Sequence, residues 1–463
     1  MQNIIDKITK KYSANTFLIN NNEKISYKNI LKRTEKKLKF IKPGDLILII
    51  ADNDIYFFEI YFYALKHNIP QILIDKNTSG ENLKKIIKLY KPNYLFLRKD
   101  NLKEFKTLDK INFYNYFVLN FSRKKIKINK DLAVLLSTSG STGSSKFVKL
   151  SHENILDNAN NIAKYLKIDK SQTTITTMVP SYSYGLSIIN SHFVKGARIV
   201  VNDNNFFNKE FWNKLNTYKV SSFGGVPFHY QIIKKLKFDK LNLVHLKYLT
   251  QAGGALDKEE LTYFIKICEK NKIKFIQMYG QTEASPRMTY LPFSKAKEKI
   301  GSIGKPIPGG RMYLKKGKTK KIGEIIYQGK NVFIGYSLSH KDLNIKKNFK
   351  ELETGDLAWR DNEGFYYITG RKNRYIKIAG LRVNLDEIKQ FLKDQKIDAE
   401  LIENENKILI FTNSDIKKDK MLNTLFIKLR LNKSFFKIIK IKSFPKNIRD
   451  KVDYKKLIKN ELY

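Results

Sequence analysis

Short apolar runs that alternate with longer amphipathic stretches constrain this chain more than any other feature. In the first third, apolar runs at Leu46–Ile50, Gln71–Ile74 and Tyr94–Leu97 are separated by helical patterns at Ile55–Lys66 and Glu81–Tyr90. Strands without a polar face are buried on both sides, and helices between them are typical of a doubly wound, mostly parallel sheet. The first third of the chain is therefore predicted to be α/β.

The same alternation resumes after residue 150. The predicted helices are Glu153–Leu166, Leu186–Val194, Asn208–Tyr218, Tyr230–Lys235 and Lys258–Lys270, and the predicted strands are Thr174–Val179, Ala197–Val201, Ser221–Gly224, Tyr248–Gln251 and Phe275–Tyr279. Clustered glycines and short β runs then predict a small β-rich subdomain over about 300–370. We expect an N-terminal domain over 1–370 and a small mobile α+β domain over 371–463, with the hinge at Gly370–Asn373.

The predicted elements of the last domain follow the same rules of periodicity. They are a helix at Leu385–Lys393, a hairpin at Ala399–Phe411, a helix at Met421–Leu431 and a strand at Phe436–Lys440.

The net charge of +44 would suit a partner that is a polyanion. However, lysines occur in short pairs along the whole chain, and no dense basic tract with interleaved aromatic residues stands out. Specific nucleic-acid binding is therefore not expected. No run of about 18 apolar residues predicts a transmembrane segment, and the N-terminus lacks the apolar region of a signal peptide. The single cysteine, Cys268, rules out an internal disulfide and fits a reducing cytoplasm.

A loop of small hydroxylated residues lies between two predicted strands, Asp131–Leu136 and Phe147–Leu150. Backbone N–H groups of such a loop can approach a polyphosphate closely, while hydroxyls and a lysine add donors. A Walker A loop instead needs Gly-Lys-Ser/Thr at the start of a helix, which disfavours a P-loop NTPase. Phosphate binding is preferred to a serine-rich linker. The candidate residues are Thr138, Ser139, Gly140, Ser141, Thr142, Gly143 and Lys146.

This loop resembles the phosphate-binding signature of the adenylate-forming superfamily, which includes acyl-CoA synthetases, nonribosomal-peptide adenylation domains and luciferases. The family pattern is Thr-Ser-Gly-(Ser/Thr)-Thr-Gly-x-Pro-Lys-Gly-Val, followed by Thr/Ser-His-x-Asn. Ser145 and Phe147 depart from it, although neither change removes a phosphate donor. The matching positions are Thr138–Gly143, Lys146, Val148, Ser151, His152 and Asn154.

The resemblance continues in order over nearly the whole chain and implies a site for ATP and Mg²⁺. A strand-end tyrosine offers a stacking face, a threonine a phosphate donor, and a glutamate a hard oxygen ligand for Mg²⁺. A carboxylate accepts two hydrogen bonds from a ribose diol. The implied adenine cradle is Gly253, Gly254 and Ala255; the strand-end motif is Tyr279, Gly280, Gln281, Thr282 and the metal ligand Glu283; the ribose and phosphate ligands are Asp356 and Arg371.

The C-terminal segment resembles the family ending Pro-(Lys/Arg)-Thr-x-x-Gly-Lys-(Ile/Val). Lys451 then takes the position of the catalytic lysine, and Asp450 stands where glycine is usual. The resemblance further implies that the last domain rotates about Gly370–Asn373 after adenylation. A face with Lys377, Gly380 and Arg382 would then guide CoA, or the phosphopantetheine of a carrier protein, to the acyl group.

The acyl pocket is expected to be lined by three segments of the N-terminal domain. No aspartate lies between Met178 and Ser191, where amino-acid-activating relatives carry one for the ammonium group, so a simple amino acid is disfavoured. His229 is interpreted as a structural histidine in preference to a pocket wall. The candidate pocket residues are Tyr182, Tyr184, Gly185, Gly224, Gly225 and Val226.

Together these patterns predict an AMP-forming ligase that activates a small carboxylic acid with ATP and transfers the acyl group to a thiol, with CoA preferred. A ligase that loads an acyl carrier protein and a noncatalytic nucleotide-binding member of the same family remain open.

Overall fold

The computed structural model describes residues 2–21, 23–99, 110–121, 126–137, 146–316, 321–378, 381–404, 407–429, 431–447 and 452–459. The chain divides into two compact units, which we describe separately. The first consists of Met1–Met312 and Tyr327–Leu352, and the second of Tyr313–Ile326 and Glu353–Tyr463. The domain boundary predicted after residue 370 falls within the second unit and stays a prediction.

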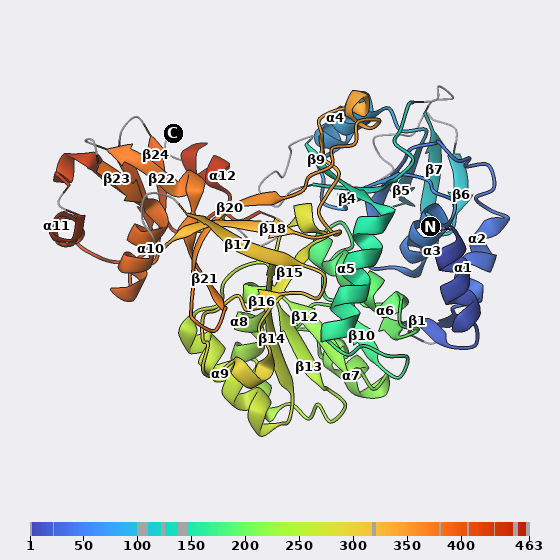
Figure 1. Ribbon diagram of the computed structural model, residues 1–463, viewed down its shortest axis with the longest axis horizontal. Coiled ribbons are helices and arrows are strands. Elements are labelled where there is room, and N and C mark those ends of the chain that lie inside the picture. Colours follow the sequence, from blue (N-terminus) through green and yellow to red (C-terminus); the bar gives the residue numbers. More distant parts are fainter. Residues whose placement is uncertain are drawn as a thin grey trace. The chain divides into compact units, whose positions relative to one another are not determined.

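The first unit contains a nine-stranded sheet in the order β16-β15-β14-β13-β12-β10-β11-β1-β2. The neighbours from β14 to β1 are parallel, while β2, β15 and β16 join the edges antiparallel. The strands are β1 (Thr16–Asn20), β2 (Glu23–Ser26), β10 (Thr173–Ile175), β11 (Arg198–Val200), β12 (Ser222–Gly225), β13 (Tyr248–Gln251), β14 (Lys274–Gly280), β15 (Arg287–Tyr290) and β16 (Lys305–Pro306). The helices are α5 (His152–Tyr165), α6 (Ser183–Phe193), α7 (Lys209–Thr217), α8 (Pro227–Lys235) and α9 (Lys258–Lys270) (Figure 1).

A second sheet of this unit has eight strands in the order β19-β9-β8-β4-β3-β5-β7-β6. Its centre, β8-β4-β3-β5, is parallel. The strands are β3 (Ile47–Ala51), β4 (Gln71–Asp75), β5 (Tyr94–Arg98), β6 (Lys110–Phe113), β7 (Tyr116–Asn120), β8 (Leu132–Ser137), β9 (Phe147–Ser151) and β19 (Tyr336–Ser337). The other helices of the unit are α1 (Gln2–Lys11), α2 (Asn29–Glu35), α3 (Ile55–Lys66) and α4 (Gly80–Tyr90).

The first unit also contains short 3₁₀ turns along both sheets. They are η2 (Phe238–Lys240), η3 (Thr282–Ala284), η4 (Phe293–Lys295) and η5 (His340–Asp342).

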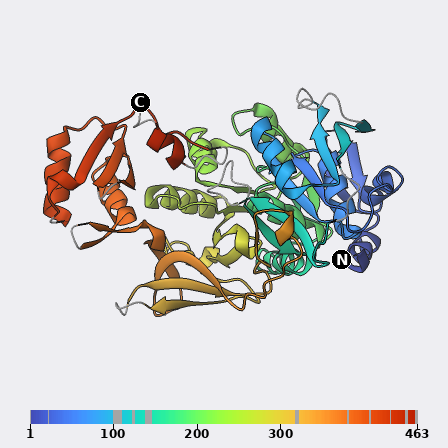
Figure 2. The same ribbon diagram turned by 90° about the horizontal axis from the view of Figure 1, so that it is seen from above.

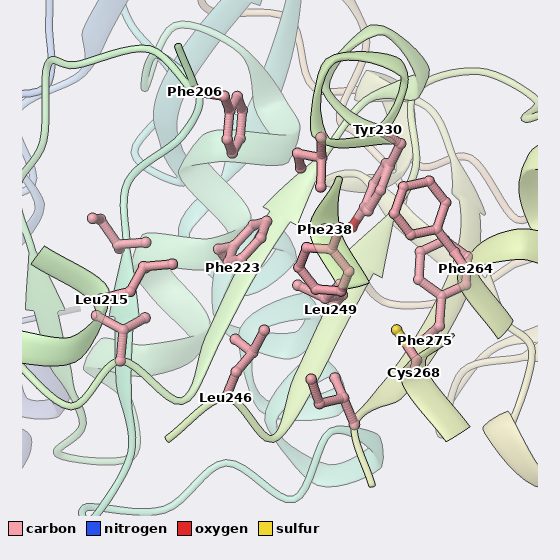
Figure 3. Packing of buried hydrophobic residues seen from close by; sticks show 14 of the residues in the cluster. Phe206, Leu215, Phe223, Tyr230, Phe238, Leu246, Leu249, Phe264, Cys268 and Phe275 are labelled. Carbon is pink, nitrogen blue, oxygen red and sulfur yellow. The ribbon is translucent and has the colours of Figure 1, made fainter. Parts of the chain in front are cut away.

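Aromatic packing holds the first sheet to its helices. Figure 3 shows Phe223 and Leu249 on adjacent strands, with Tyr230 and Phe264 packed over them from α8 and α9. Burying side chains of this size stabilises the unit by roughly 1.5–3 kcal/mol each. Cys268 lies in the same cluster with no exposed surface, and burial raises the pKa of its thiol to about 12. This cysteine is therefore a core residue and not a nucleophile.

The second unit contains three smaller sheets. Their orders are β17-β18-β20-β21, β22-β23 and β24-β25-β26. Figure 2 shows the part after residue 381, coloured orange to red, as helices and strands. Its buried apolar side chains form a cluster that includes Leu392, Leu401 and Ile410. The elements are β17 (Arg311–Lys316), β18 (Gly323–Gln328), β20 (Leu352–Arg360), β21 (Tyr366–Arg371), η6 (Lys372–Arg374), β22 (Tyr375–Ile378), β23 (Leu381–Asn384), α10 (Leu385–Asp394), β24 (Ala399–Asn404), β25 (Lys407–Thr412), α11 (Lys418–Leu429), η7 (Lys433–Phe435), β26 (Phe436–Lys440) and α12 (Tyr454–Lys459).

The predicted α/β class is confirmed, and several predicted boundaries differ from the structure. The helices predicted to begin at Tyr230 and Met421 begin three residues earlier, at Pro227 and Lys418. Helix α6 begins at Ser183 and not at Leu186, so Gly185 lies within its first turn. A Cβ at Gly185 would lie 2.7 Å from the carbonyl oxygen of Val179, which explains a glycine in a helix. The strand predicted at Thr174–Val179 ends at Ile175. A membrane-crossing helix is not found, since none of the described helices is both long and apolar enough.

Candidate active site

The hydroxyl-rich loop lies between two paired strands. Strands β8 and β9 pair antiparallel, with Ser137 opposite Phe147. The predicted phosphate ligands between them, Thr138, Ser139, Gly140, Ser141, Thr142 and Gly143, lie outside the described residues. Lys146 is described, and its Nζ lies 3.7 Å from the ring centroid of Tyr336. This cation–π contact places the ammonium group of Lys146 beside the ring of Tyr336.

Tyr336 also contacts the predicted metal ligand. Its hydroxyl donates a hydrogen bond to Oε1 of Glu283 at 2.9 Å. Burial and the neighbouring carboxylate raise the pKa of Tyr336 well above its usual range, so the hydroxyl stays a donor at neutral pH. The backbone of Tyr336 pairs with Val148 on β9. One residue thus joins the hairpin that carries Lys146 to the turn that carries Glu283.

The turn after β14 is shaped by a close chain crossing. A Cβ at Gly280 would lie 1.9 Å from the carbonyl oxygen of Pro286, so no side chain fits there. The N–H of Gln281 donates to the same oxygen at 3.0 Å. Thr282 is buried, and its hydroxyl lies 3.2 Å from that of Ser183 at the start of α6. The crossing thereby presents Glu283 and the half-buried Tyr279 on either side of a fixed turn.

The first glycine after β13 lies against a tyrosine from the predicted pocket. Gly253 has φ +84°, and a Cβ there would lie 2.5 Å from the hydroxyl of Tyr182. Gln251 stabilises the turn, because its Nε2 donates to the carbonyl oxygen of Gly254 at 2.8 Å. Gly254 and Ala255 are exposed. Bare backbone at this strand end is compatible with the predicted adenine cradle, which stays a prediction.

The pocket candidates on α6 and β12 pack against each other. The hydroxyl of Tyr184 donates to the carbonyl oxygen of Thr250 at 2.8 Å. A Cβ at Gly224 would lie 2.9 Å from this hydroxyl, and one at Gly225 would lie 2.9 Å from the ring of Tyr230. Val226 follows directly as the residue before α8. These small residues leave room for aromatic side chains, so the structure brings the candidates into one cluster.

His229 lies beside this cluster, with its ring centroid 4.9 Å from that of Phe206. Burial lowers the pKa of His229 to about 4, so the ring is neutral at physiological pH. Its Nδ1 is sealed from solvent and has no hydrogen-bond partner in the described part of the chain. This environment suits packing and offers no acid or base.

Two residues of this region, Tyr336 and Arg287, were not predicted from the sequence. Tyr336 is 53 positions from Glu283, and no local pattern links them. Arg287 lies opposite Gly280 in the β14–β15 register and is only 2% exposed. A charged residue only four positions after the predicted metal ligand Glu283 is a signal that could have been used.

In the second unit, Asp356 and Arg371 lie opposite each other on β20 and β21. Nε of Arg371 donates to Oδ1 of Asp356 at 2.8 Å. The carboxylate is 5% exposed, whereas the arginine side chain is 64% exposed. The two predicted ribose and phosphate ligands therefore form an ion pair with each other in the protein itself.

The remaining candidates of the second unit are only partly described. The backbones of Lys377 and Arg382 are paired in the β22–β23 register, and Gly380 lies outside the described residues. Lys451 also lies outside them. The described residues before and after it form an isolated antiparallel β-bridge, between Lys446 and Val452. The role of Lys451 stays a prediction.

The arrangement can be compared with solved structures. The chain superposes on O-succinylbenzoate coenzyme A synthetase from Bacillus subtilis in complex with AMP, with a TM-score of 0.80 and 17% identity over 99% of this chain and 98% of that one. The structure of the same synthetase with ATP and magnesium gives a TM-score of 0.78 and 17% identity over 99% of both chains. These likenesses establish the fold.

Sequence relatives carry the identification further. The chain is 29% identical over 287 residues to a long-chain-fatty-acid–CoA ligase from Bacillus subtilis, which is 60% of this chain and 50% of the relative. It is 29% identical over 317 residues to oxalate–CoA ligase from Saccharomyces cerevisiae, which is 66% and 56%. The chain spans about half the length of these relatives. The AMP-binding enzyme family matches residues 5–337, and the chain belongs to this family.

Proposed function

We propose that the protein is an AMP-forming acid–thiol ligase. It converts a carboxylic acid and ATP into an acyl-adenylate and pyrophosphate, and then passes the acyl group to a thiol. One observation carries the proposal: Lys146, beside the hydroxyl-rich loop, and Glu283 both contact Tyr336. A cation and a hard oxygen ligand so close together are what a metal-bound triphosphate requires.

The residues present suit ATP and Mg²⁺. In the described part of the chain, the Glu283 side chain accepts a hydrogen bond from Tyr336 and has no cation within ion-pair distance. Its charge is therefore available to a metal. No cluster of three metal-binding side chains is found among the described residues. Such a sparse ligand set fits Mg²⁺, which usually keeps several waters and takes further oxygens from phosphates.

The chemistry to be catalysed joins two anions. A carboxylate oxygen of the acid attacks the α-phosphorus, the bond from this phosphorus to the bridging oxygen breaks, and pyrophosphate leaves. Mg²⁺, when bound, supplies charge neutralisation on the phosphate oxygens. Lys146 would add a fixed cation, and Thr282, held by Ser183, would present its hydroxyl without reorganisation. Lys451 is the proposed bridge between the two reacting anions.

The nucleotide sugar and the acceptor are assigned to the second unit. We assign the ribose to the buried carboxylate of Asp356, which Arg371 orients. CoA is the preferred acceptor because several relatives are named as CoA ligases. A carrier protein is the alternative acceptor. The single buried cysteine is compatible with a reducing cytoplasm, which is the proposed location.

The test is pyrophosphate release over a panel of carboxylic acids, followed by addition of CoA or a phosphopantetheinyl carrier protein. We expect release with at least one acid, loss of release in Lys451→Ala, and thioester formation with CoA. ATP binding without release for any acid, unchanged by Lys451→Ala, would show a noncatalytic nucleotide-binding protein instead. Thioester formation with the carrier protein alone would correct the acceptor.

A further inference from the structure

Arg287 is a buried cation held by neutral groups. Its Nε donates to the Ser187 hydroxyl at 3.2 Å, and its Nη1 donates to the Tyr165 hydroxyl at 3.2 Å and to Sδ of Met278 at 2.8 Å. The guanidinium also lies over the ring of Tyr184, with the carbon 4.7 Å from the centroid. The side chain is thus fixed by three elements, α5, α6 and β14.

No anion balances this charge within the described residues. None of their carboxylates lies within ion-pair distance of Arg287, and they give its Nη2 no hydrogen-bond partner. The residue is only 2% exposed, so very little of the charge is in contact with bulk water. Arginine stays protonated in proteins, so the site cannot escape the cost of burial by releasing a proton. A buried charge of this kind needs a paired anion.

The position of Arg287 indicates where that anion comes from. Its backbone lies opposite Gly280, in the turn that carries Thr282 and Glu283. Its guanidinium packs on Tyr184, a pocket candidate whose hydroxyl lies next to Gly224. The backbone of Arg287 is therefore beside the turn assigned to the phosphates and the metal. Its guanidinium, however, lies on a residue assigned to the acid.

We propose that Arg287 binds a second carboxylate on the acid, so that the natural substrate is a dicarboxylic acid activated at its other end. This inference rests on the proposed function and adds the substrate class. A planar guanidinium with two spare N–H groups on Nη2 matches a carboxylate. The cation–π contact with Tyr184 holds the guanidinium in place between turnovers.

The test compares each diacid with its own monomethyl ester, which keeps the shape and removes one charge. The pairs are succinate, glutarate and phthalate with their monomethyl esters, and the assay is pyrophosphate release. In the wild-type protein, we expect the best diacid to exceed its ester by at least about tenfold in kcat/KM. Arg287→Gln should bring the ratio to near one, and Arg287→Lys should give an intermediate ratio. Arg311→Gln, at an exposed arginine, is the matched control and should keep the wild-type ratio.

Binding is measured in parallel, as the shift in melting temperature with each acid. A diacid should stabilise the wild-type protein more than its ester does, and this difference should vanish in Arg287→Gln. If release occurs with monocarboxylic acids and every ester equals its diacid, the inference is overturned while the proposed function stands. If diacids bind selectively through Arg287 but release never occurs, the proposed function fails and the anion subsite stands. Should Arg287→Gln not fold, the wild-type ratio and Arg287→Lys decide.

Discussion

The β14 turn and the β20–β21 hairpin each carry one carboxylate that is predicted to bind the nucleotide or its metal. The two carboxylates differ in burial and in their protein partners. Glu283 is half-buried and accepts a single hydrogen bond from a tyrosine. Asp356 is almost fully buried and is paired with an arginine. A carboxylate without a neighbouring protein cation keeps its full negative charge for a metal. One that must accept hydrogen bonds from a sugar can be paired, because it keeps lone pairs for neutral donors.

The largest expected effect tests the first half of this comparison. Glu283→Gln keeps the shape and the hydrogen bond from Tyr336 but removes the charge that a metal needs. We expect adenylation to fall by roughly 10²–10³-fold at saturating acid. Pyrophosphate release at several Mg²⁺ concentrations measures this effect. Glu260→Gln, on α9, is the control and should leave the rate unchanged; equal rates in the two variants would contradict the role of Glu283.

The two regions also differ in how far they could be predicted. The parallel strands and most helices followed from periodicity, because burial on both faces leaves a local pattern in the sequence. The family resemblance predicts Asp356 and Arg371 as ligands fifteen residues apart, and hairpin pairing brings them together. Tyr336 was missed because its contacts with Lys146 and Glu283 depend on how separate strands are ordered in two sheets. No local pattern records that order.

The second prediction concerns pH and separates the two units. All six histidines fall in the first unit. Burial lowers the pKa of His192 to about 4, compared with about 6.5 in the unfolded chain. The unfolded state therefore binds the proton first, so the stabilisation is complete above about pH 6.5 and is lost as pH falls towards 4. For His192 alone, the loss at pH 5 is up to about 2 kcal/mol.

Hydrogen exchange of peptides from each unit at pH 7 and pH 5 measures this difference, after correction for intrinsic rates. Protection should fall at pH 5 in the first unit and change little in the second. His192→Leu should reduce the fall in the first unit. Equal loss of protection in both units would contradict the assignment of the acid sensitivity to buried histidines.

A smaller effect is expected at Tyr336. Tyr336→Phe keeps the ring beneath Lys146 and removes only the hydrogen bond to Glu283. Because a hydrogen bond to a charged group contributes roughly 1.5–3 kcal/mol and this one is partly exposed, about a fivefold rise in the Mg²⁺ needed for half-maximal rate is expected. Tyr336→Leu removes both contacts and should also raise the KM for ATP. If Tyr336→Phe and Tyr336→Leu behave alike, the ring has no separate role in holding Lys146.

The smallest effect is expected for the pair that looks strongest. A double-mutant cycle with Asp356→Asn and Arg371→Gln should give a coupling in unfolding free energy of only about 0.2–1 kcal/mol. The reason is that the arginine side chain is 64% exposed, so water solvates the guanidinium almost as well when the carboxylate is removed. Urea unfolding of the four proteins measures the coupling. A value well above this range would mean that the ion pair mainly stabilises the fold. The burial of Asp356 would then have a structural reason and would not indicate ligand binding. A value within it, together with weaker ATP binding in Asp356→Asn, would mean that Asp356 is kept buried for a ligand.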